Sequence, residues 1–406
     1  MQEKLLSSQL ENSISTQLDS KLAKVILPWV FRHPRYLRAS FALLRSVKQA
    51  KKKRLELMTD GLQVPPFLIL SITSKCNLKC KGCFAAAVGN IYNSNSKINY
   101  KSKPHLDYSH WHAIIKEAKE LGVMGFVIAG GEPFLFPDLL KLCKEFKDRL
   151  FIILTNGTNV SQDDFKILKT TSNVAVLVSL EGGSQLTDIR RGAGVYIKAL
   201  DTLKKLSKYG IPNGISATIT RMNYRYWMDE KNIDRLIDLG IRIGVFLEYI
   251  PTTPDFLNCQ KSLFPQIQPN DVNEWLSDND HMLMLTSTER LEFRKQIHNY
   301  RNKKSIYIIH SPGDEEYFGG CVSAGRGFAH VTPNGDLTPC PVSDITTHNL
   351  AKSSLRDGLA SRLFCEIRDN EHLLEVEGTP CALFAHPQEV DALAKKVGAY
   401  RANSRL

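Results

Sequence analysis

Three cysteines stand close together in the segment Cys76-Asn-Leu-Lys-Cys80-Lys-Gly-Cys83. Three residues separate the first two cysteines and two residues separate the second pair. Three thiols this close together cannot all form disulfides, and they would contribute little as core residues. Thiolate is a soft ligand that suits iron–sulfur clusters and zinc. A structural zinc site normally takes four protein ligands, and no fourth Cys or His stands nearby. The spacing therefore predicts an iron–sulfur cluster with one open iron, while zinc and incidental thiols remain as alternatives.

Four more cysteines occupy the last quarter of the chain: Cys321, Cys340, Cys365 and Cys381. Between the first two, the sequence Pro333-Asn334-Gly335-Asp336 indicates a turn that joins two strand-like runs. Cys365 stands in the helical pattern SRLFCEIRD, where a core role is the alternative to metal ligation. We expect the remaining cysteines, Cys143 and Cys259, to be ordinary residues, and His386 to be a loop histidine.

Six short apolar runs alternate with helical patterns, and the runs are of strand length. They are Phe67–Thr73, Gly125–Ala129, Leu150–Leu154, Val174–Leu180, Ile215–Ile219 and Ile243–Ile250. Runs rich in Val, Ile and Leu are typical of strands buried on both faces, and the helices between them are expected to begin at caps such as Ser109 and Ser161. The alternation predicts an α/β fold, a partial (β/α)6 barrel whose strand carboxyl ends carry the chemistry.

With the cysteines placed after the first strand, the chain resembles the radical S-adenosylmethionine (radical SAM) superfamily. Further motifs match in order at successive strand ends: Gly130-Gly131-Glu132-Pro133, Thr155-Asn156-Gly157, Ser179-Leu180-Glu181-Gly182 and Arg190-Arg191-Gly192. The resemblance covers about residues 65–250 and implies that Cys76, Cys80 and Cys83 hold a [4Fe–4S] cluster. It also implies SAM-binding residues: Phe84, Gly130, Gly131, Glu132, Pro133, Asn156, Ser179, Glu181 and Arg191. We expect the paired glycines to let backbone approach the ligand, and the Glu132 carboxylate to accept its cationic amine.

The resemblance also implies the reaction. Enzymes of this family bind the amino and carboxylate groups of SAM at the open iron and cleave SAM reductively to a 5′-deoxyadenosyl radical. That radical abstracts hydrogen from an unactivated C–H bond, and the protein positions the target carbon. The chemistry requires a low-potential electron donor such as flavodoxin or ferredoxin. Glu248 and Tyr249, at the end of the sixth run, could face the substrate or form an exposed pair on a strand edge.

The C-terminal cysteines resemble the auxiliary-cluster extension called SPASM, or its shortened form called twitch. A cysteine before a hairpin and the element Gly335-x4-Cys340 match that pattern, but the dense run of later cysteines is missing. We therefore expect one auxiliary [4Fe–4S] cluster, held by Cys321, Cys340 and Cys381. Cys365 is the candidate fourth ligand, and if it does not bind, the auxiliary iron could be open to substrate.

The basic residues are concentrated in one segment. The 406-residue chain has a formal net charge of +11, and residues 21–54 hold six Lys and five Arg with no acid, so the remainder is neutral. This distribution argues against a nucleic-acid-binding body. Leu37, Phe41 and Leu44 share a helical face beside the basic one, which predicts an amphipathic helix. The helix could contact an anionic membrane, pack on the barrel, or bind RNA or an acidic peptide.

The sequence therefore predicts three parts: a polar tail and basic arm over 1–60, a radical SAM barrel over 61–300, and a small α+β auxiliary-cluster domain over 301–395. Without a visible signal peptide or spanning segment we expect a cytoplasmic enzyme, with the arm peripheral at the inner face of the membrane. The arm motivates a membrane lipid or lipid-linked substrate. A peptide substrate, as in ribosomal peptide maturation, is the alternative, and a non-catalytic iron–sulfur or zinc scaffold is the second.

Overall fold

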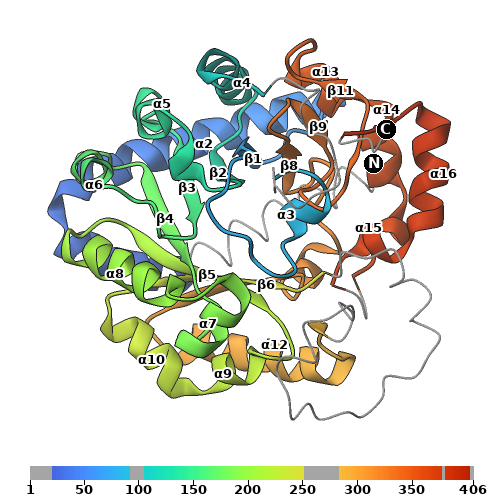
Figure 1. Ribbon diagram of the computed structural model, residues 1–406. Coiled ribbons are helices and arrows are strands. Elements are labelled where there is room, and N and C mark those ends of the chain that lie inside the picture. The colour runs from blue at the N-terminus through green and yellow to red at the C-terminus, as the bar shows by residue number, and fades with distance from the viewer. Residues whose placement is uncertain (1–20, 92–104, 251–282, 377–379, 403–406) are drawn as a thin grey trace.

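The computed structural model describes residues 21–91, 105–250, 283–376 and 380–402. Its centre is a ten-stranded sheet in the order β11-β9-β8-β1-β2-β3-β4-β5-β6-β7 (Figure 1). The strands of the barrel are β1 (Phe67–Thr73), β2 (Gly125–Gly130), β3 (Leu150–Thr155), β4 (Val174–Ser179), β5 (Asn213–Ile219), β6 (Ile243–Glu248) and β7 (Tyr307–Ser311). Each is parallel to the next. The predicted α/β fold with a parallel sheet of radical SAM type is confirmed.

The six predicted strands all form, and β7 is an addition. The sequence analysis missed β7 because its apolar part is too short to be distinguished from the end of a helix. It follows helix α12 (Ser287–Lys303) and pairs with β6 from Ile243↔Tyr307 to Leu247↔Ser311. The parallel part of the barrel therefore continues beyond residue 300.

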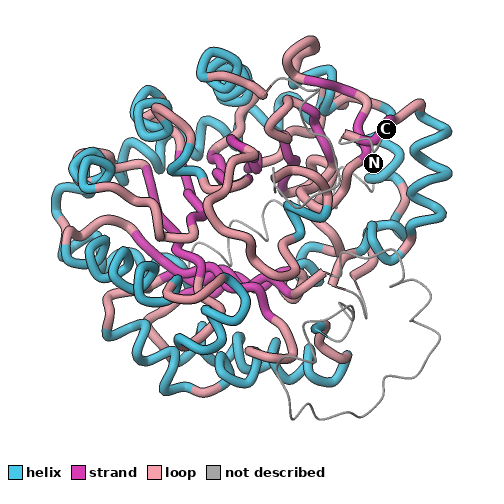
Figure 2. The backbone as a smooth tube through the Cα atoms, in the orientation of Figure 1, coloured by secondary structure: helices cyan, strands magenta, loops and turns pink. Residues whose placement is uncertain are grey.

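Helices lie on the outer side of the strands (Figure 2). They are α4 (Tyr108–Glu120), α5 (Leu139–Glu145), α6 (Gln162–Leu168), α7 (Ser184–Arg191), α8 (Val195–Lys208), α9 (Tyr224–Met228) and α10 (Glu230–Asp238), with the short η3 (Pro133–Leu135) after β2. The predicted cap of α6 is confirmed, since Ser161 and Asp164 form a reciprocal capping box. The predicted cap of α4 is wrong. Asp107 caps this helix, because its carboxylate accepts hydrogen bonds from the His110 backbone N–H and the Ser109 hydroxyl.

The C-terminal region extends the same sheet. Strand β8 (Phe328–Val331) runs parallel to β1 and is followed by the antiparallel β9 (Asp336–Thr338), which confirms the predicted hairpin. β11 (His348–Asn349) continues the sheet, whereas β10 (Ile345–Thr346) pairs with β12 (Tyr400–Arg401). Around them lie η6 (Glu315–Phe318), α13 (Leu355–Leu359), α14 (Arg362–Asp369), η7 (Glu371–Leu374), α15 (Ala382–Ala385) and α16 (Pro387–Val397). The proposed domain boundaries remain a prediction.

One buried histidine joins the two parts of the sheet. His330 on β8 is fully buried, and its two ring nitrogens lie 2.8 Å from the Ser71 hydroxyl on β1 and 2.8 Å from the Thr338 hydroxyl on β9. Burial lowers the pKa of His330 to about 3. The neutral ring therefore crosslinks three strands without bringing a charge into the core.

The basic arm forms two helical segments, residues 21–32 and α2 (Leu37–Thr59), with η1 (Pro34–Tyr36) between them. The Arg54 guanidinium is buried and donates to the Gly122 carbonyl, 2.7 Å away, just past the end of α4. Arg35 donates to the carbonyls of Tyr209 and Gly210, just past the end of α8. Cations at helix carboxyl ends oppose the helix dipole and satisfy free carbonyls. Part of the arm therefore packs against the barrel.

The rest of the arm is exposed. Among its apolar side chains, Phe31 is 71% exposed, Phe41 63%, Leu44 58% and Leu27 52%. These side chains lie among exposed basic residues and make no contribution to the core. In the described part of the chain, no helix combines the length and apolar character needed to cross a bilayer.

Candidate functional site

The first cysteine loop connects β1 to the short helix α3 (Phe84–Ala87). The three thiols belong to half-buried residues, and Phe84, directly after the last one, is 37% exposed. Two neighbouring loops hold the cysteine loop through backbone hydrogen bonds: Glu132 N–H donates to the Lys75 carbonyl at 2.8 Å, and Lys81 N–H donates to the Arg190 carbonyl at 2.8 Å. The turn after β2 and the end of α7 thus determine where the thiols lie.

Two arginines make this loop suitable for thiolates. Burial raises the pKa of the Cys80 thiol, and the nearby Arg191 and Arg190 guanidinium groups oppose that rise. Burial raises the pKa of Cys76 to about 11. Neutral thiols in such a place become ligands only when a cation replaces their protons. The donor set therefore fits a metal cluster.

The structure shows a packing role for the paired glycines that the sequence did not predict. A Cβ on Gly131 would lie 2.0 Å from the Lys75 carbonyl oxygen, and one on Gly130 would lie 2.5 Å from that of Thr73. The close approach that these glycines permit is thus to the backbone at the end of β1. Gly130 also has φ +111°, a conformation that favours glycine. Contact between these glycines and a ligand remains a prediction.

Glu132 is buried, and its carboxylate is already held by the protein. It accepts from the Thr155 hydroxyl at 2.6 Å, the Asn156 N–H at 2.8 Å and the Phe134 N–H at 3.2 Å. Burial raises its pKa against these hydrogen bonds. Glu132 therefore joins the ends of β2 and β3, and Pro133 begins η3 directly after it. Any amine it recognises must approach a carboxylate that has been oriented in advance.

Glu181 is the centre of a buried ion cluster. Its Oε1 atom lies 2.6 Å from Arg190 Nη1 and 2.7 Å from Arg191 Nε, and its Oε2 atom accepts from the Thr218 N–H at 3.0 Å. The arginines and these hydrogen bonds outweigh burial and hold the pKa of Glu181 below its ordinary value. Arg190 also donates to the Gly82 carbonyl in the cysteine loop, at 3.3 Å. Ser179, two residues earlier, ends β4.

Two residues of this site were missed in the sequence. Arg190 stands beside the predicted Arg191, and motif order alone could not choose between them. Asn77 lies inside the cysteine loop, accepts a hydrogen bond from the Asn156 side chain at 2.8 Å and donates to the Thr158 hydroxyl at 2.8 Å. The only available signal for Asn77 was its position between two predicted ligands, so its contact with the Asn156 turn could not be foreseen.

At the end of β6 neither residue is exposed, so the alternative of an exposed pair on a strand edge is wrong, and contact with the substrate remains a prediction. Glu248 forms a buried ion pair with Arg290 on α12 at 2.5 Å, and its other carboxylate oxygen lies 3.1 Å from His310 Nε2 on β7. Tyr249 is buried, and a Cβ on Gly82 would lie 2.9 Å from its ring. Tyr249 forms an apolar cluster with Leu283 and Met284, and the half-buried Phe384 of α15 packs against this cluster.

A second set of three thiols lies in the C-terminal region. Cys321, Cys340 and Cys381 are linked by electrostatic contacts, from Cys321 to Cys340 and from Cys340 to Cys381. Burial is the largest cause of the raised pKa of each thiol. Ser323 is fully buried, and the Cys321 thiol is the neighbour of its hydroxyl. The predicted ligands are thus brought together from three separate segments.

Cys365, on α14, has partners of its own. Arg368 donates to its sulfur at 3.3 Å, and the thiol lies 3.8 Å from the Ala360 carbonyl. It is not among the groups that perturb the other three thiols. Cys143 is fully buried in the core, as expected. Cys259 lies outside the described residues.

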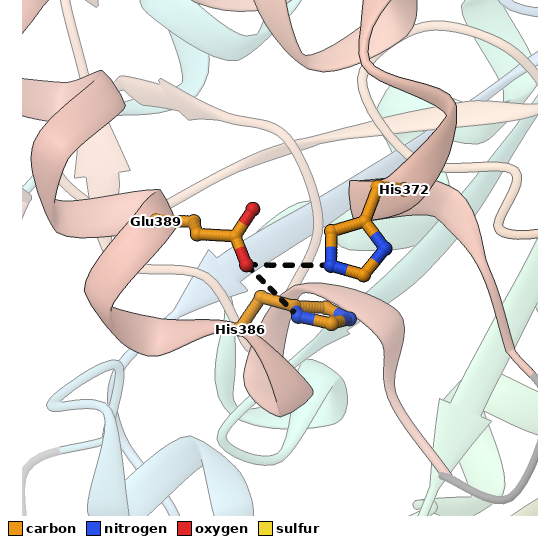
Figure 3. A group of neighbouring side chains, drawn as sticks. All are labelled: His372, His386 and Glu389. Atoms are coloured by element: carbon orange, nitrogen blue, oxygen red, sulfur yellow. Dashed lines mark ion pairs between the residues drawn. The ribbon is translucent and has the colours of Figure 1, made fainter.

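His386 lies between α15 and α16, as expected for a loop histidine, and it is part of a small surface cluster (Figure 3). Its Nδ1 atom lies 3.3 Å from Glu389 Oε1, and His372 Nε2 lies 3.3 Å from the same oxygen. The cluster is partly solvent-exposed and separate from both cysteine triads. Its three side chains could bind a stray metal ion, so metal analyses of the protein need a control at His372.

Comparison with known proteins agrees with this geometry. Residues 70–239 match the family model "Radical SAM superfamily". The sporulation killing factor maturation protein SkfB of Bacillus subtilis is 22% identical over 77% of this chain and 70% of its own length. The PqqA peptide cyclase of Rhizobium meliloti is 24% identical over 75% of this chain and 74% of its own.

Among solved structures, Streptococcus suis SuiB bound to the precursor peptide SuiA has the same fold. It superposes with a TM-score of 0.59 at 19% identity, over 80% of this chain and 71% of SuiB. Fold and motifs together define an enzyme that uses a [4Fe–4S] cluster and SAM. Residues 70–239 form a radical SAM domain, and the relatives of the chain are of the SPASM/twitch type, which carry auxiliary clusters.

Proposed function

We propose that this protein is a peptide-modifying radical SAM enzyme with two [4Fe–4S] clusters. Cys76, Cys80 and Cys83 hold the cluster that binds SAM, and Cys321, Cys340 and Cys381 hold the auxiliary cluster. When bound, the first cluster and SAM supply a 5′-deoxyadenosyl radical, which removes hydrogen from the substrate. Cys365 is left out of the ligand set because its thiol contacts Arg368 instead of the other cysteines.

The observation that carries this proposal is the presence of two cysteine triads with one apolar cluster between them. Tyr249 packs over Gly82 of the first loop. The same tyrosine belongs to an apolar cluster against which Phe384, three residues beyond Cys381, packs. Apolar side chains at this place exclude water and can hold an aliphatic or aromatic substrate carbon beside both clusters.

The charged residues of the barrel have separable roles. Glu181 neutralises Arg190 and Arg191, which are positioned to stabilise thiolates and to attract the carboxylate of SAM. Glu132 is held in place to accept the amine of SAM, and Asn156 connects that carboxylate to the cysteine loop. Phe84, Pro133 and Ser179 complete the proposed binding surface at the ends of their elements.

A peptide substrate is better supported than the lipid expected from the basic arm. The curated relatives include a maturation protein and a peptide cyclase, and their similarity covers about three quarters of this chain. No comparison supports a lipid substrate. The second alternative, a non-catalytic scaffold, does not explain the matched motifs at the strand ends.

The experiment is anaerobic reconstitution followed by incubation with SAM, dithionite and short peptides encoded beside the gene. Two clusters predict about eight irons per chain, formation of 5′-deoxyadenosine and a mass change in one peptide. Cys80→Ala should abolish SAM cleavage, while Cys143→Ser, at a core cysteine outside the proposed ligands, serves as the control. Unchanged SAM cleavage in Cys80→Ala, or modification of lipid extract instead of peptide, would contradict the proposal.

The exposed part of the basic arm supports an additional proposal about location. Phe31, Phe41 and Leu44 project among Lys and Arg side chains, an arrangement suited to the inner face of an anionic membrane. Flotation with phosphatidylserine vesicles should recover the full chain, and replacing these three residues with Ser should abolish recovery. Equal recovery on neutral phosphatidylcholine vesicles would exclude the electrostatic contribution. A flavodoxin or ferredoxin is the proposed electron donor.

A further inference from the structure

Glu315 is a buried carboxylate beside the second cysteine triad, and the proposed function does not use it. It begins η6, six residues before Cys321, and is 8% exposed. The Cys321 thiol hydrogen-bonds to its carboxylate. The same carboxylate acts electrostatically on Cys340 and Cys381, so all three thiols share it as a neighbour.

No basic side chain forms a direct ion pair with this carboxylate among the residues that the structure describes. Arg326 is close enough to act on it, but the Arg326 guanidinium donates instead to the carbonyls of Cys321, Phe318 and Gly319. A buried carboxylate that faces three potential thiolates without a direct counter-ion is costly. A cationic metal centre at this position would remove that cost.

The carboxylate is also held in a defined orientation. Ser311, the last residue of β7, donates its hydroxyl hydrogen to Glu315 Oε1 at 2.7 Å. Such a bond from a neighbouring residue is how proteins orient metal ligands. The Val322 N–H, next to Cys321, provides a second hydrogen bond to the carboxylate.

From this arrangement we propose that Glu315 is the fourth protein ligand of the auxiliary cluster, binding through a carboxylate oxygen the iron that three cysteines leave open. The inference rests on the proposed auxiliary cluster and extends it. Cys365 is turned toward Arg368, so Glu315 is, among the described residues, the remaining carboxylate or thiol that the fold brings to Cys321, Cys340 and Cys381 together. The cluster is then closed to the peptide, and its role is electron transfer or support rather than direct binding of substrate.

The opposing interpretation is that Glu315 is a structural anchor for the loop before Cys321, through Ser311 and Val322. An anchor requires a hydrogen-bond acceptor, which Gln supplies. A ligand requires an anionic donor, which Cys supplies and Gln does not. The variants Glu315→Gln and Glu315→Cys therefore separate the two interpretations.

The experiment isolates the second cluster by replacing Cys76, Cys80 and Cys83 with Ala in one chain, followed by anaerobic reconstitution with ⁵⁷Fe. Iron content, Mössbauer spectra and the electron paramagnetic resonance of the reduced cluster are recorded with and without potassium cyanide, a small ligand for an open iron. With Glu315 present, about four irons should bind and cyanide should leave the resonance unchanged. In Glu315→Gln, cyanide should shift the resonance, or oxidation should release about one of the four irons.

Glu315→Cys should again be insensitive to cyanide, and the control Glu371→Gln, a neighbouring carboxylate outside the site, should behave like the parent chain. A cyanide shift in the parent, no shift or iron loss in Glu315→Gln, or loss of the cluster from both Glu315 variants would overturn the inference. If the chain without the first cysteine triad binds no iron while Glu315 is present, the proposed auxiliary cluster is refuted together with the role of Glu315. Cyanide binding by a fully loaded parent refutes the role of Glu315 alone.

Discussion

Replacing Glu181 with Gln tests how the barrel holds its first cysteine loop. The Glu181 side chain is 2% exposed and pairs with Arg190 and Arg191, which are 15% and 11% exposed. The substitution keeps the shape but leaves two buried guanidinium groups without a carboxylate. Breaking a buried ion pair from one side costs about 3–5 kcal/mol. An unfolding entropy of about 2.1 cal/mol/K per residue gives about 1.2 °C per kcal/mol for a chain of 406 residues, so the melting temperature should fall by about 4–6 °C.

The same change should empty the first cluster site selectively. Arg190 contacts the cysteine loop twice, by accepting from Lys81 N–H and by donating to the Gly82 carbonyl. Once Arg190 loses its anchor, the loop should lose the geometry of its thiols. We expect Glu181→Gln to bind about four irons instead of about eight and to retain the spectrum of the auxiliary cluster.

The assay combines thermal unfolding, iron analysis and the pH dependence of stability. Because the pKa of Glu181 is lowered in the folded state, its contribution is present at neutral pH and disappears as pH falls through that lowered pKa. The difference in the free energy of unfolding between the parent and Glu181→Gln should therefore become smaller in acid. Glu375→Gln, which alters an exposed pair with His372, should change stability by less than about 1 kcal/mol. If Glu181→Gln melts within 2 °C of the parent and binds full iron, the reasoning is refuted.

Three further predictions follow from single contacts. Gly131→Ala should lose the first cluster, because its Cβ would meet the Lys75 carbonyl, whereas Gly183→Ala should bind full iron, since its nearest neighbour is 3.6 Å away. Arg54→Met should lower stability by about 1.5–3 kcal/mol in denaturant unfolding, because the buried bond to the Gly122 carbonyl is charge-assisted; the exposed Lys52→Met should not. Burial lowers the pKa of His330 to about 3, so between pH 7.5 and pH 5 only the unfolded chain takes up a proton on this ring. The free energy of unfolding should therefore fall by about 2 kcal/mol over that range. This pH dependence should be weaker in His330→Gln, and an unchanged dependence would contradict the prediction.

The six barrel strands could be predicted because burial on both faces produces apolar runs of distinctive length. The motif residues between Gly130 and Gly182 were also expected at the carboxyl ends of these strands, and the structure has them there. β7 escaped because its apolar part is brief, and the cap of α4 was wrong because Asp107 and Ser109 are both good caps within two residues of each other. Local sequence patterns therefore predict which helices and strands form better than they predict the residue at which each one begins.

The contact partners of side chains could be predicted less well from the sequence. The glycines at 130 and 131 were expected to admit a ligand, yet their neighbours are backbone atoms of the preceding strand, a contact that exists only after β1 and β2 pair. Glu248 was considered as part of an exposed pair, and in the structure it is buried and meets Arg290 and His310 from later elements. Each difference arises from a partner far away in the chain.

The net charge of +11 has a more limited meaning in the folded protein than in the sequence. Two of the eleven basic residues of the arm, Arg35 and Arg54, cap the ends of barrel helices, so their charges serve packing. Most of the others lie beside Phe31, Phe41 and Leu44, which the core does not use. Packing on the barrel does not account for large apolar side chains that are exposed to solvent. Binding to a membrane surface requires both the charges and the aromatic groups. We therefore propose that location and chemistry are separate in this chain, with the arm determining where the enzyme lies and the two cysteine triads determining what it does.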